Sequence, residues 1–593
     1  MDRSMEPQPN DLFFYAAEGS LADLERIVKS HKDWLQHRDA RGRDALMHAA
    51  IADNYKNFQF LHKKGLSLWE RDSNGAIVLH WAAQCRAYKV VRHILQNSTG
   101  QELFLVKDKD GVTALHIAAA QSCNKMLKLF LEFITPNDNI FEKAQDKRGR
   151  SPLHYAASRA SVECVATILD SSVLGLTVDQ KDKHGVTPLM CAVGVVLPPA
   201  IDVCRLLAQR KMLAVSARNK FGHTALHLAV AAYNISVVKL LVEELKCQVE
   251  VRYISKMRTP LHYAAEQDQS EIVQLLLAYG AKNSTKDHFG VTPAHYAAQF
   301  SRTCLETIFA TTGITEVKDR QQRSCLMWAV CAGNIEVIEF LVKRTAPERH
   351  DMDIHGFTAL HLAAMVGNEN VCKVLVKQGW NISERDKQDN TPLHLAAGRG
   401  NTDVVRFLVT SGANINDKDT HQRTPIFWAC FGGQSHTLYC MIKEMSFQWR
   451  TTERPARPVT DALGRTPLHA AAFAGSAACI NMMLGIEAED DCLSSPLIGW
   501  KDNDGETALH VACERGHMAC VLSLLKGGAA INALNKRGLT PLECAQEHKA
   551  IRDHLQAQRA MTRDELVKEA ALTIWYWWKW RVKLRRKANS AYL

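Results

Sequence analysis

A short motif that recurs along the chain decides the fold. It reads TPLHLAA at residues 391–397, TPLHYAA at 259–265, GVTALHIAA at 111–119 and TALHVA at 507–512. The leading Thr, or the residue that replaces it, falls at positions 11, 44, 77, 113, 151, 187, 224, 259, 292, 324, 358, 391, 424, 466, 507 and 540. The steps are 32 to 38 residues long, apart from two of 42 and 41. A period of this length predicts one array of sixteen stacked repeats rather than several separate domains.

Each repeat contains the signals of two helices and a turn. Thr is a favoured N-cap and Pro a favoured first helical residue, so Thr-Pro begins a helix abruptly. A second helix is expected at residues 403–409, where apolar residues recur at helical spacing, and Gly412 follows where a helix end favours a left-handed residue. Polar turns rich in Asp and Gly separate the repeats, as in KDKDG at 107–111. One such repeat cannot bury its apolar face alone, so stability must come from its neighbours.

The period and the T-P-L-H-x-A core resemble the ankyrin repeat. The resemblance implies an all-α solenoid of helix-turn-helix repeats with β-hairpin fingers over residues 11–556, preceded by a short N-terminal segment at 1–10. Two insertions interrupt the regular spacing of the repeats, a basic one at 446–461 and an acidic one at 486–499. Insertions in such arrays map to loops, which are either tolerated surface loops or parts of a binding side.

Composition excludes several classes of protein. The chain has 593 residues, and 73 Lys and Arg against 63 Asp and Glu leave a net charge of +10. Hydrophobic residues are 46% and charged residues 23%, which is ordinary for a globular protein and argues against a disordered chain. No apolar run approaches the ~18 residues of a membrane span, and the N-terminus lacks the apolar core of a secretory signal. Seventeen cysteines without a Cys-x-x-Cys pair favour reduced thiols, so we expect a cytoplasmic protein, with the nucleus as an alternative.

Histidine is abundant but predicts no catalysis. Ten of the 25 histidines fill one slot of the repeat: His80, His116, His154, His227, His262, His295, His361, His394, His469 and His510. We expect each ring to bind backbone or the Thr hydroxyl between repeats. No zinc-binding spacing, phosphate-binding loop or nucleophile motif occurs in the sequence. The sequence therefore predicts a protein that is not an enzyme, with no catalytic residue, metal or cofactor, whose function lies in surfaces that hold other proteins.

Residues 562–588 predict a Trp-rich, basic helix after the array. Thr562 and Glu565 form a capping-box pattern, so the helix should begin at about Arg563. Apolar residues at spacings of four and three fall on one stripe: Val567, Ala571, Ile574, Trp578 and Val582. Six cationic residues lie between 579 and 587.

A basic amphipathic helix with aromatic residues is typical of calmodulin targets and of membrane-surface helices. Residues 574–585 resemble a degenerate IQ motif, the calmodulin-binding signature, with Ile574 and Lys579 at the matching spacing and Trp in the Gln and Gly positions. We expect calmodulin or a light-chain-like protein to bind Ile574, Trp575, Trp578, Lys579, Val582, Lys583 and Arg585. The alternatives are docking on the end of the array, binding to a membrane surface, and nuclear import through the basic cluster at 583–587.

Sixteen ankyrin repeats followed by an IQ-like helix resemble the inversin family. Local departures from the motif match as well, such as RSCLMWA at 323–329, HYAAQ at 295–299 and LM at 46–47. The resemblance implies a scaffold of ciliary or cytoskeletal complexes in Wnt and planar polarity signalling. The partners that it implies are nephrocystin-type ciliary proteins and Dishevelled, with no nucleic acid and no membrane span.

One finger is singled out as a contact point. In KDHFG at 286–290, Lys286 and Phe289 are candidates because an aromatic side chain on a polar turn is a suitable anchor for a partner. The alternative is that Phe289 packs on a neighbouring finger.

Two further hypotheses keep the fold and change the function. One is a substrate adaptor or soluble regulator in ubiquitin or transcriptional signalling, although no recruitment domain is visible in the sequence. The other, the cytoplasmic region of an ion channel, is disfavoured because no spanning segment is present.

Overall fold

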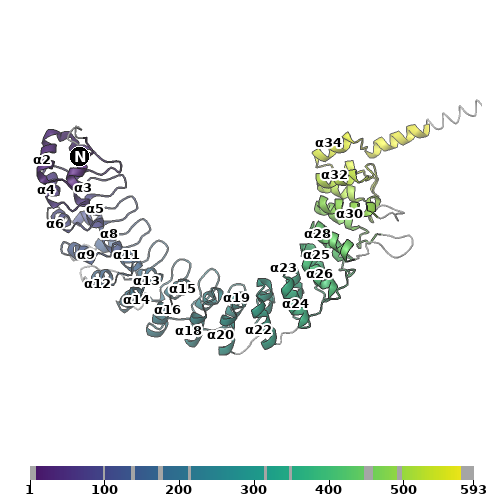
Figure 1. Ribbon diagram of the computed structural model, residues 1–593, viewed down its shortest axis with the longest axis horizontal. Coiled ribbons are helices and arrows are strands. Elements are labelled where there is room, and N and C mark those ends of the chain that lie inside the picture. The colour runs from purple at the N-terminus through teal and green to yellow at the C-terminus, as the bar shows by residue number, and fades with distance from the viewer. Residues whose placement is uncertain are drawn as a thin grey trace, which may run out of the picture. The chain divides into compact units, whose positions relative to one another are not determined.

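A computed structural model describes residues 8–97, 101–134, 140–170, 178–210, 215–312, 317–345, 350–445, 458–489 and 497–575. Regular structure in these ranges is helical, and they contain no β-strand. The helices follow one another as sixteen antiparallel pairs joined by loops (Figure 1). The predicted all-α class and the array of sixteen repeats are confirmed.

The first helix of each pair carries the repeated motif. These helices are α1 (Asp11–Ala17), α3 (Ala45–Ile51), α5 (Val78–Gln84), α8 (Ala114–Ala120), α11 (Pro152–Ser158), α13 (Pro188–Val193), α15 (Ala225–Ala231), α17 (Pro260–Glu266), α19 (Pro293–Phe300), α21 (Cys325–Ala332), α23 (Ala359–Val366), α25 (Pro392–Arg399), α27 (Pro425–Phe431), α29 (Pro467–Ala474), α31 (Ala508–Arg515) and α33 (Pro541–Cys544). The small residues of the motif are buried, as in Ala396 and Ala397, so that successive first helices pack closely.

The second helix of each pair packs behind the first. These helices are α2 (Leu21–Ser30), α4 (Tyr55–Lys63), α6 (Tyr88–Asn97), α9 (Asn124–Leu131), α12 (Val162–Asp170), α14 (Pro199–Arg210), α16 (Ile235–Lys239) with η3 (Leu240–Glu244), α18 (Ser270–Ala278), α20 (Arg302–Thr312), α22 (Ile335–Thr345), α24 (Glu369–Lys377), α26 (Thr402–Thr410), α28 (Ser435–Tyr439) with η4 (Cys440–Glu444), α30 (Ala477–Glu489), α32 (Met518–Lys526) and α34 (Lys549–Ala557). Four short helices lie in the connections: η1 (Lys32–Gln36), α7 (Gln101–Leu105), α10 (Ile140–Lys143) and η5 (Leu497–Gly499).

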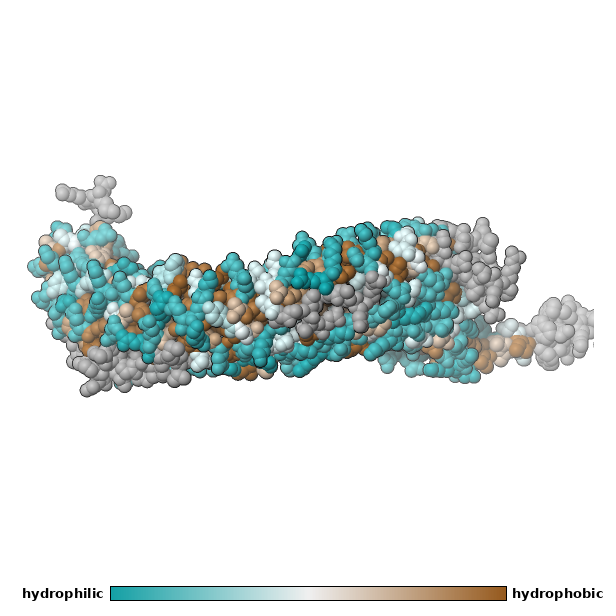
Figure 2. Space-filling model, turned by 90° about the horizontal axis from the view of Figure 1, so that it is seen from below, coloured by the Kyte–Doolittle hydropathy of each residue, from teal (hydrophilic) through white to brown (hydrophobic). Residues whose placement is uncertain are grey.

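The chain divides into two compact units, each described by itself. The N-terminal unit comprises residues 1–297 and 303–315, and the C-terminal unit comprises 298–302 and 316–593. Within each unit, first helices contact first helices and second helices contact second helices, as in α25 with α27 and α26 with α28. Hydrophobic residues on the face shown in Figure 2 form small patches among hydrophilic ones.

The connections between repeats are tight fingers, each held by one carboxylate. The Asp108 N–H donates to the Val112 carbonyl (3.0 Å), and Asp108 Oδ1 accepts from the N–H groups of Asp110 and Val112 (2.8 Å each). Gly111 adopts a φ of +80°, and a Cβ there would lie 2.5 Å from the nitrogen of Lys147 in the next finger. That nitrogen donates to the Asp110 carbonyl (2.9 Å). The fingers therefore have a hairpin-type bond and are linked in series, but the described residues are too tightly turned to form strands.

The predicted insertions are only partly within the described ranges, which omit 446–457 and 490–496. The start of the predicted acidic insertion continues α30 to Glu489 instead of leaving the array as a loop. There Glu487 is buried and accepts a hydrogen bond from the Leu497 N–H (2.6 Å). This bond fixes the two ends of the insertion against the repeat.

Where a repeat carries the repeated histidine, that side chain joins the repeat to the next one. In His394, Nδ1 accepts from the Thr391 N–H (3.1 Å) and lies 2.9 Å from Thr391 Oγ1, while Nε2 lies 3.1 Å from the Arg423 carbonyl in the following finger. Because a backbone N–H can only donate and a carbonyl can only accept, the ring is neutral with its proton on Nε2. The same pair of backbone contacts is made by His80, His116, His154, His227, His262, His361, His469 and His510. The predicted structural role of these rings is confirmed.

We predict that the array loses stability as the pH falls from about 6.5 towards 4. Burial lowers the pKa of His116, His227, His262 and His394 to about 4, from an ordinary value of 6.5. The folded chain therefore binds fewer protons than the unfolded chain in this window. The histidine contribution to the free energy of unfolding is complete above pH 6.5 and is lost on descent to the folded pKa. Thermal unfolding followed by circular dichroism should show a Tm that decreases steadily from pH 6.5 to 4.5, and a constant Tm over that range would contradict the prediction.

Candidate functional site

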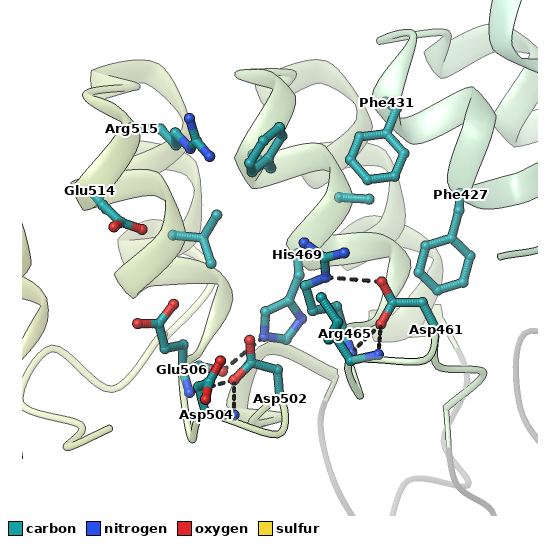
Figure 3. A pocket seen from close by; sticks show the side chains of 14 residues that line it. Phe427, Phe431, Asp461, Arg465, His469, Asp502, Asp504, Glu506, Glu514 and Arg515 are labelled. Carbon is teal, nitrogen blue, oxygen red and sulfur yellow. Dashed lines mark hydrogen bonds and ion pairs between the residues drawn. The ribbon is translucent and has the colours of Figure 1, made fainter. Parts of the chain in front are cut away.

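The candidate site is a groove in the C-terminal unit, between the fingers and the first helices α23 to α31. Its apolar half encloses about 440 Å³ and is lined chiefly by Phe357, Met365, Leu395, Trp428 and Phe431. Its acidic half encloses about 150 Å³ beside α29 and α31 (Figure 3). Phe431 lines both halves, so they adjoin.

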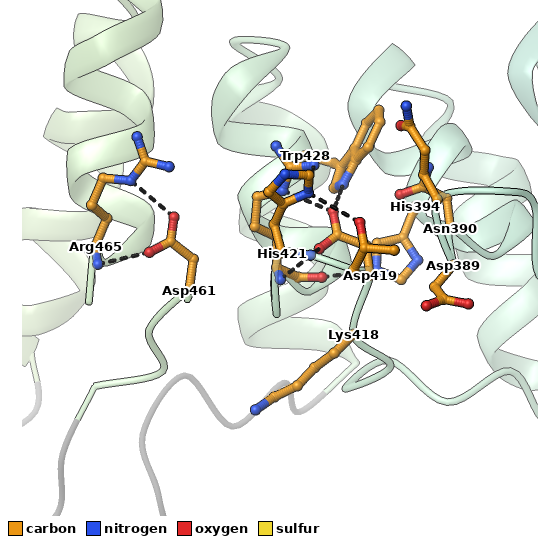
Figure 4. A network of polar contacts seen from close by, with 12 residues as sticks. Asp389, Asn390, His394, Lys418, Asp419, His421, Trp428, Asp461 and Arg465 are labelled. Carbon is orange, nitrogen blue, oxygen red and sulfur yellow. Dashed lines mark hydrogen bonds and ion pairs between the residues drawn. The ribbon is translucent and has the colours of Figure 1, made fainter. Parts of the chain in front are cut away.

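A triad of Asp, Arg and Trp connects a finger to the wall of the groove (Figure 4). Asp419 Oδ1 accepts from the N–H groups of His421 (2.9 Å) and Arg423 (2.8 Å). Asp419 Oδ2 accepts from Arg423 Nε (2.8 Å) and from Trp428 Nε1 (3.2 Å). Burial alone would raise the pKa of Asp419, but the hydrogen bonds from Arg423 and Trp428 outweigh burial and hold that pKa below its ordinary value. One carboxylate thus shapes the finger and orients the indole.

The same arrangement recurs on both units. In the pairs Asp72–Trp81, Asp146–Tyr155, Asp287–Tyr296 and Asp319–Trp328, the ring N–H or O–H donates to the carboxylate over 2.8 to 3.1 Å. The aromatic residue stands nine positions after the Asp, and an Arg often stands four positions after it. The sequence interpretation missed these contacts, although the spacing D-x-x-x-R-x-x-x-x-W is visible in the sequence.

Two glycines let α25 and α27 approach closely beneath the indole. A Cβ on Gly432 would lie 2.0 Å from the Gly398 carbonyl oxygen, and a Cβ on Gly398 would lie 3.0 Å from Trp428 Cε3. Any larger residue at Gly432 would push the two helices apart. The absence of side chains here also leaves one edge of the apolar half open.

Asn390, beside the apolar half, holds a buried acceptor that has no hydrogen-bond partner. The residue is 1% exposed, and its Nδ2 donates to Asp386 Oδ2 (2.9 Å). Because a carboxylate only accepts, this bond fixes the orientation of the amide. Oδ1 is then left buried without a hydrogen-bond partner, which is a costly arrangement for a polar atom.

The acidic half has an excess of carboxylates. Its lining holds five of them, from Asp461, Asp502, Asp504, Glu506 and Glu514, against the two arginines Arg465 and Arg515. Arg465 Nε donates to Asp461 (2.9 Å), so this pair largely compensates itself. Burial, together with the neighbouring carboxylates of Glu514 and Asp502, raises the pKa of Glu506. Net negative charge therefore remains around the finger at 502–506.

The C-terminal helix begins against the last repeat and has an exposed apolar stripe. It runs from residue 563 to 575, the last described residue, with the Thr562 N–H donating to Glu565 Oε2 (2.8 Å) and the Arg563 N–H to Glu543 Oε1 (3.2 Å). Of the predicted binding residues, Ile574 is 67% exposed and Trp575 is 47% exposed. The others, Trp578, Lys579, Val582, Lys583 and Arg585, lie outside the described residues.

The predicted fingertip contact belongs to the N-terminal unit, whereas the groove belongs to the C-terminal unit. Lys286 is exposed, and Phe289 is 54% exposed with its ring edge-on to His288 of the same finger, at 5.4 Å between centroids. Phe221 and Ile254 on the two preceding fingers are exposed as well. Backbone bonds link these fingers in series, from Ile254 N–H to the Phe221 carbonyl (3.2 Å) and from His288 N–H to the Lys256 carbonyl (2.9 Å). The sequence interpretation found only the last of these apolar tips.

Among the residues that the structure describes, no group of three or more His, Cys, Asp or Glu side chains is placed to hold a metal ion. Within the same ranges, no helix is long and apolar enough to cross a membrane.

Family comparisons agree with the architecture. A family model described as "Ankyrin repeats (3 copies)" matches residues 12–105, 100–173, 137–213, 199–287, 280–353 and 343–419. Models described as "Ankyrin repeats (many copies)" and "Ankyrin repeat" match residues 491–545 and 463–492.

Among similar proteins, inversin of Mus musculus is 29% identical over 365 residues, which are 61% of this chain and 33% of inversin. Rabankyrin-5 of Mus musculus is 28% identical over 280 residues, 47% of this chain and 23% of that protein. The human transient receptor potential cation channel subfamily A member 1 is 31% identical over 213 residues, 35% of this chain and 18% of the channel. The chain thus matches a third or less of the length of each of these relatives.

Among solved structures, the ankyrin repeat domain of Bcl-3 is 28% identical, with a TM-score of 0.32, and the match covers 35% of this chain and 95% of that domain.

We predict that Trp428→Phe loosens the finger at 419–423. The change removes the hydrogen bond from Nε1 to Asp419 but keeps an aromatic ring over Gly398. A hydrogen bond of this kind contributes about 1 kcal/mol, so hydrogen exchange at the N–H groups of His421 and Arg423 should accelerate about fivefold. Mass spectrometry or NMR of the full chain measures this exchange.

Trp328→Phe is the matched control, because Trp328 Nε1 donates to Asp319 in the same way (3.1 Å). This variant should accelerate hydrogen exchange at Gln321 and Arg323, because their N–H groups donate to Asp319. It should leave the exchange rates at residues 421 and 423 unchanged. Unchanged exchange at 421 and 423 in Trp428→Phe would show that the indole does not restrain the finger.

Proposed function

The chain belongs to the ankyrin-repeat family, and from that premise we propose that it is a scaffold that assembles signalling proteins at the cilium or the cortical cytoskeleton. Ankyrin arrays are protein-interaction modules, and stacked repeats give them extended binding surfaces. The observation that carries the proposal is the presence of separate candidate surfaces on one chain, namely the groove, the apolar fingertips and the exposed helix at 563–575.

Three surfaces on one chain suit simultaneous binding. The groove lies in the C-terminal unit, and the fingertips of Phe221, Ile254 and Phe289 belong to the N-terminal unit. A partner held at one surface raises the effective concentration of a second partner near it, so that weak individual contacts add up to a stable complex. This is how a protein that performs no chemistry can organise a pathway.

The similarity to inversin supports the place and the partners that we propose. By resemblance to the inversin family, the partners are nephrocystin-type ciliary proteins and Dishevelled, in Wnt and planar polarity signalling. Calmodulin is the partner that we propose for the IQ-like helix, through Ile574, Trp575, Trp578, Lys579, Val582, Lys583 and Arg585. The exposure of Ile574 and Trp575 supports this part of the proposal, because a calmodulin target must present its apolar side chains.

We predict that the tagged full chain concentrates in cilia when it is expressed in ciliated cells. Imaging against a ciliary membrane marker measures the ratio of ciliary to cytoplasmic signal. A chain of the same length in which the exposed tips Phe221, Ile254 and Phe289 are changed to Ser should fold, because these side chains are not buried, and should be less enriched. Even distribution of the unmodified chain through the cytoplasm would refute the ciliary part of the proposal.

We predict that the full chain binds calmodulin and that Trp578→Ala combined with Lys579→Ala weakens binding at least tenfold. The paired change removes one apolar anchor and one cation from the IQ-like stretch. Isothermal titration with and without Ca²⁺ measures the affinity. Lys568→Ala, on the exposed helix but before the motif, is the control and should bind as the unmodified chain does. Absence of binding in both conditions would remove calmodulin from the proposal.

A further inference from the structure

We propose that the groove of the C-terminal unit binds a basic segment of a partner protein, which inserts an aromatic side chain into the apolar half. The inference rests on the proposed scaffold function and specifies the chemistry of one partner. Two features of the groove support it, and each concerns a different part of the bound segment.

The shape and lining of the apolar half fit an aromatic side chain. The space of about 440 Å³ lies against the Trp428 indole and the Phe431 ring, with Leu395 and Met365 beside them. Its walls are fixed before binding, since Asp419 holds the indole and Gly398 lies beneath it. Aromatic side chains gain more than others in such a pocket, because they bury a large area and lose few rotamers.

The acidic half determines the charge of the residues beside the anchor. Five carboxylates and two arginines line it, and Asp504 and Glu514 are exposed towards solvent. Lys or Arg side chains next to the aromatic anchor would relieve the repulsion among these carboxylates. An acidic partner would increase it. Because Phe431 borders both halves, the anchor and the cations belong to one continuous segment.

The experiment selects binders without assuming their sequence. The immobilised full chain is panned against a random 16-residue peptide library displayed on phage, and the enriched peptides are synthesised with a fluorescent label. We expect them to contain Trp or Tyr within a few residues of two or more Lys or Arg. Fluorescence anisotropy then gives Kd for each peptide at two salt concentrations, and affinity should fall at the higher one.

A charge-reversed variant tests the acidic half. Asp504→Lys with Glu514→Lys should weaken peptide binding by about tenfold or more, because both side chains border the proposed path of the cations. The matched control is Glu339→Lys with Asp553→Lys, which makes the same change in net charge at exposed positions of the second helices α22 and α34. The control should bind as the unmodified chain does. Both variants are checked for unchanged thermal unfolding.

Modified peptides test the anchor without altering the protein. Replacing the anchor Trp or Tyr with Ala should weaken binding about tenfold or more, because the apolar half is then left unfilled. A peptide with benzoylphenylalanine at the anchor position should cross-link on illumination within residues 357–432, which mass spectrometry locates.

The remaining outcomes overturn the proposal. They are the enrichment of acidic peptides, no enrichment, equal affinity for the charge-reversed variant and its control, or cross-links outside 357–432. Recovery of a segment with the sequence of this chain would assign the groove to a second copy and would also overturn it. The scaffold proposal survives each of these results, because ciliary enrichment and calmodulin binding are measured separately.

Discussion

The hydrogen bond from a neutral histidine ring to the finger of the next repeat is the contact on which the rest of the array depends. His394 illustrates it, since Nδ1 accepts from the N–H of its own helix cap and Nε2 donates to the Arg423 carbonyl. A repeat has too little apolar surface to fold alone, so its geometry is set where it meets a neighbour. The bond fixes the height of each finger above its helix. Protonation of the ring would instead remove the acceptor at Nδ1, and with it the bond from the helix cap.

The position of the finger then sets the position of the groove wall. The carbonyl that His394 binds belongs to Arg423, whose N–H and Nε both donate to Asp419. The second oxygen of Asp419 accepts from the indole of Trp428. A continuous chain of hydrogen bonds therefore runs from one repeat's helix cap to an aromatic side chain of the next. A change in the histidine slot would disturb the binding surface as well as the stability.

The sequence predicted the elements that depend on local chemistry. Caps at residues such as Thr113, Ser151 and Thr391 begin helices where the motif places them, because capping involves residues three positions apart. The groove could not be predicted in this way, since Asn390 and Glu514 come from different repeats and are more than a hundred positions apart. An orphaned acceptor is also invisible in sequence, because it is defined by partners that are absent. Of the predicted IQ-like residues, the structure describes only Ile574 and Trp575, and the binding role of the whole set stays a prediction.

The groove lies where a finger Asp lacks the two other members of the triad, the Arg four positions later and the Trp or Tyr nine positions later. Four residues after Asp386 stands Asn390 in place of Arg, and nine residues after it stands Leu395 in place of Trp or Tyr. The short amide satisfies the carboxylate but leaves its own oxygen free, and Leu395 supplies no donor.

At Asp502 the corresponding residues are Glu506 and Val511, which supply neither a cation nor a ring donor to that carboxylate. The Arg and the aromatic residue of the triad are thus replaced by Asn390 and Leu395 in one repeat, which leaves an apolar wall, and by Glu506 and Val511 in another, which adds a carboxylate. An array built from nearly identical repeats can therefore acquire a specific binding site by substitution at two positions per repeat, while His361, His394, His469 and His510 still join the repeats of the groove to their neighbours.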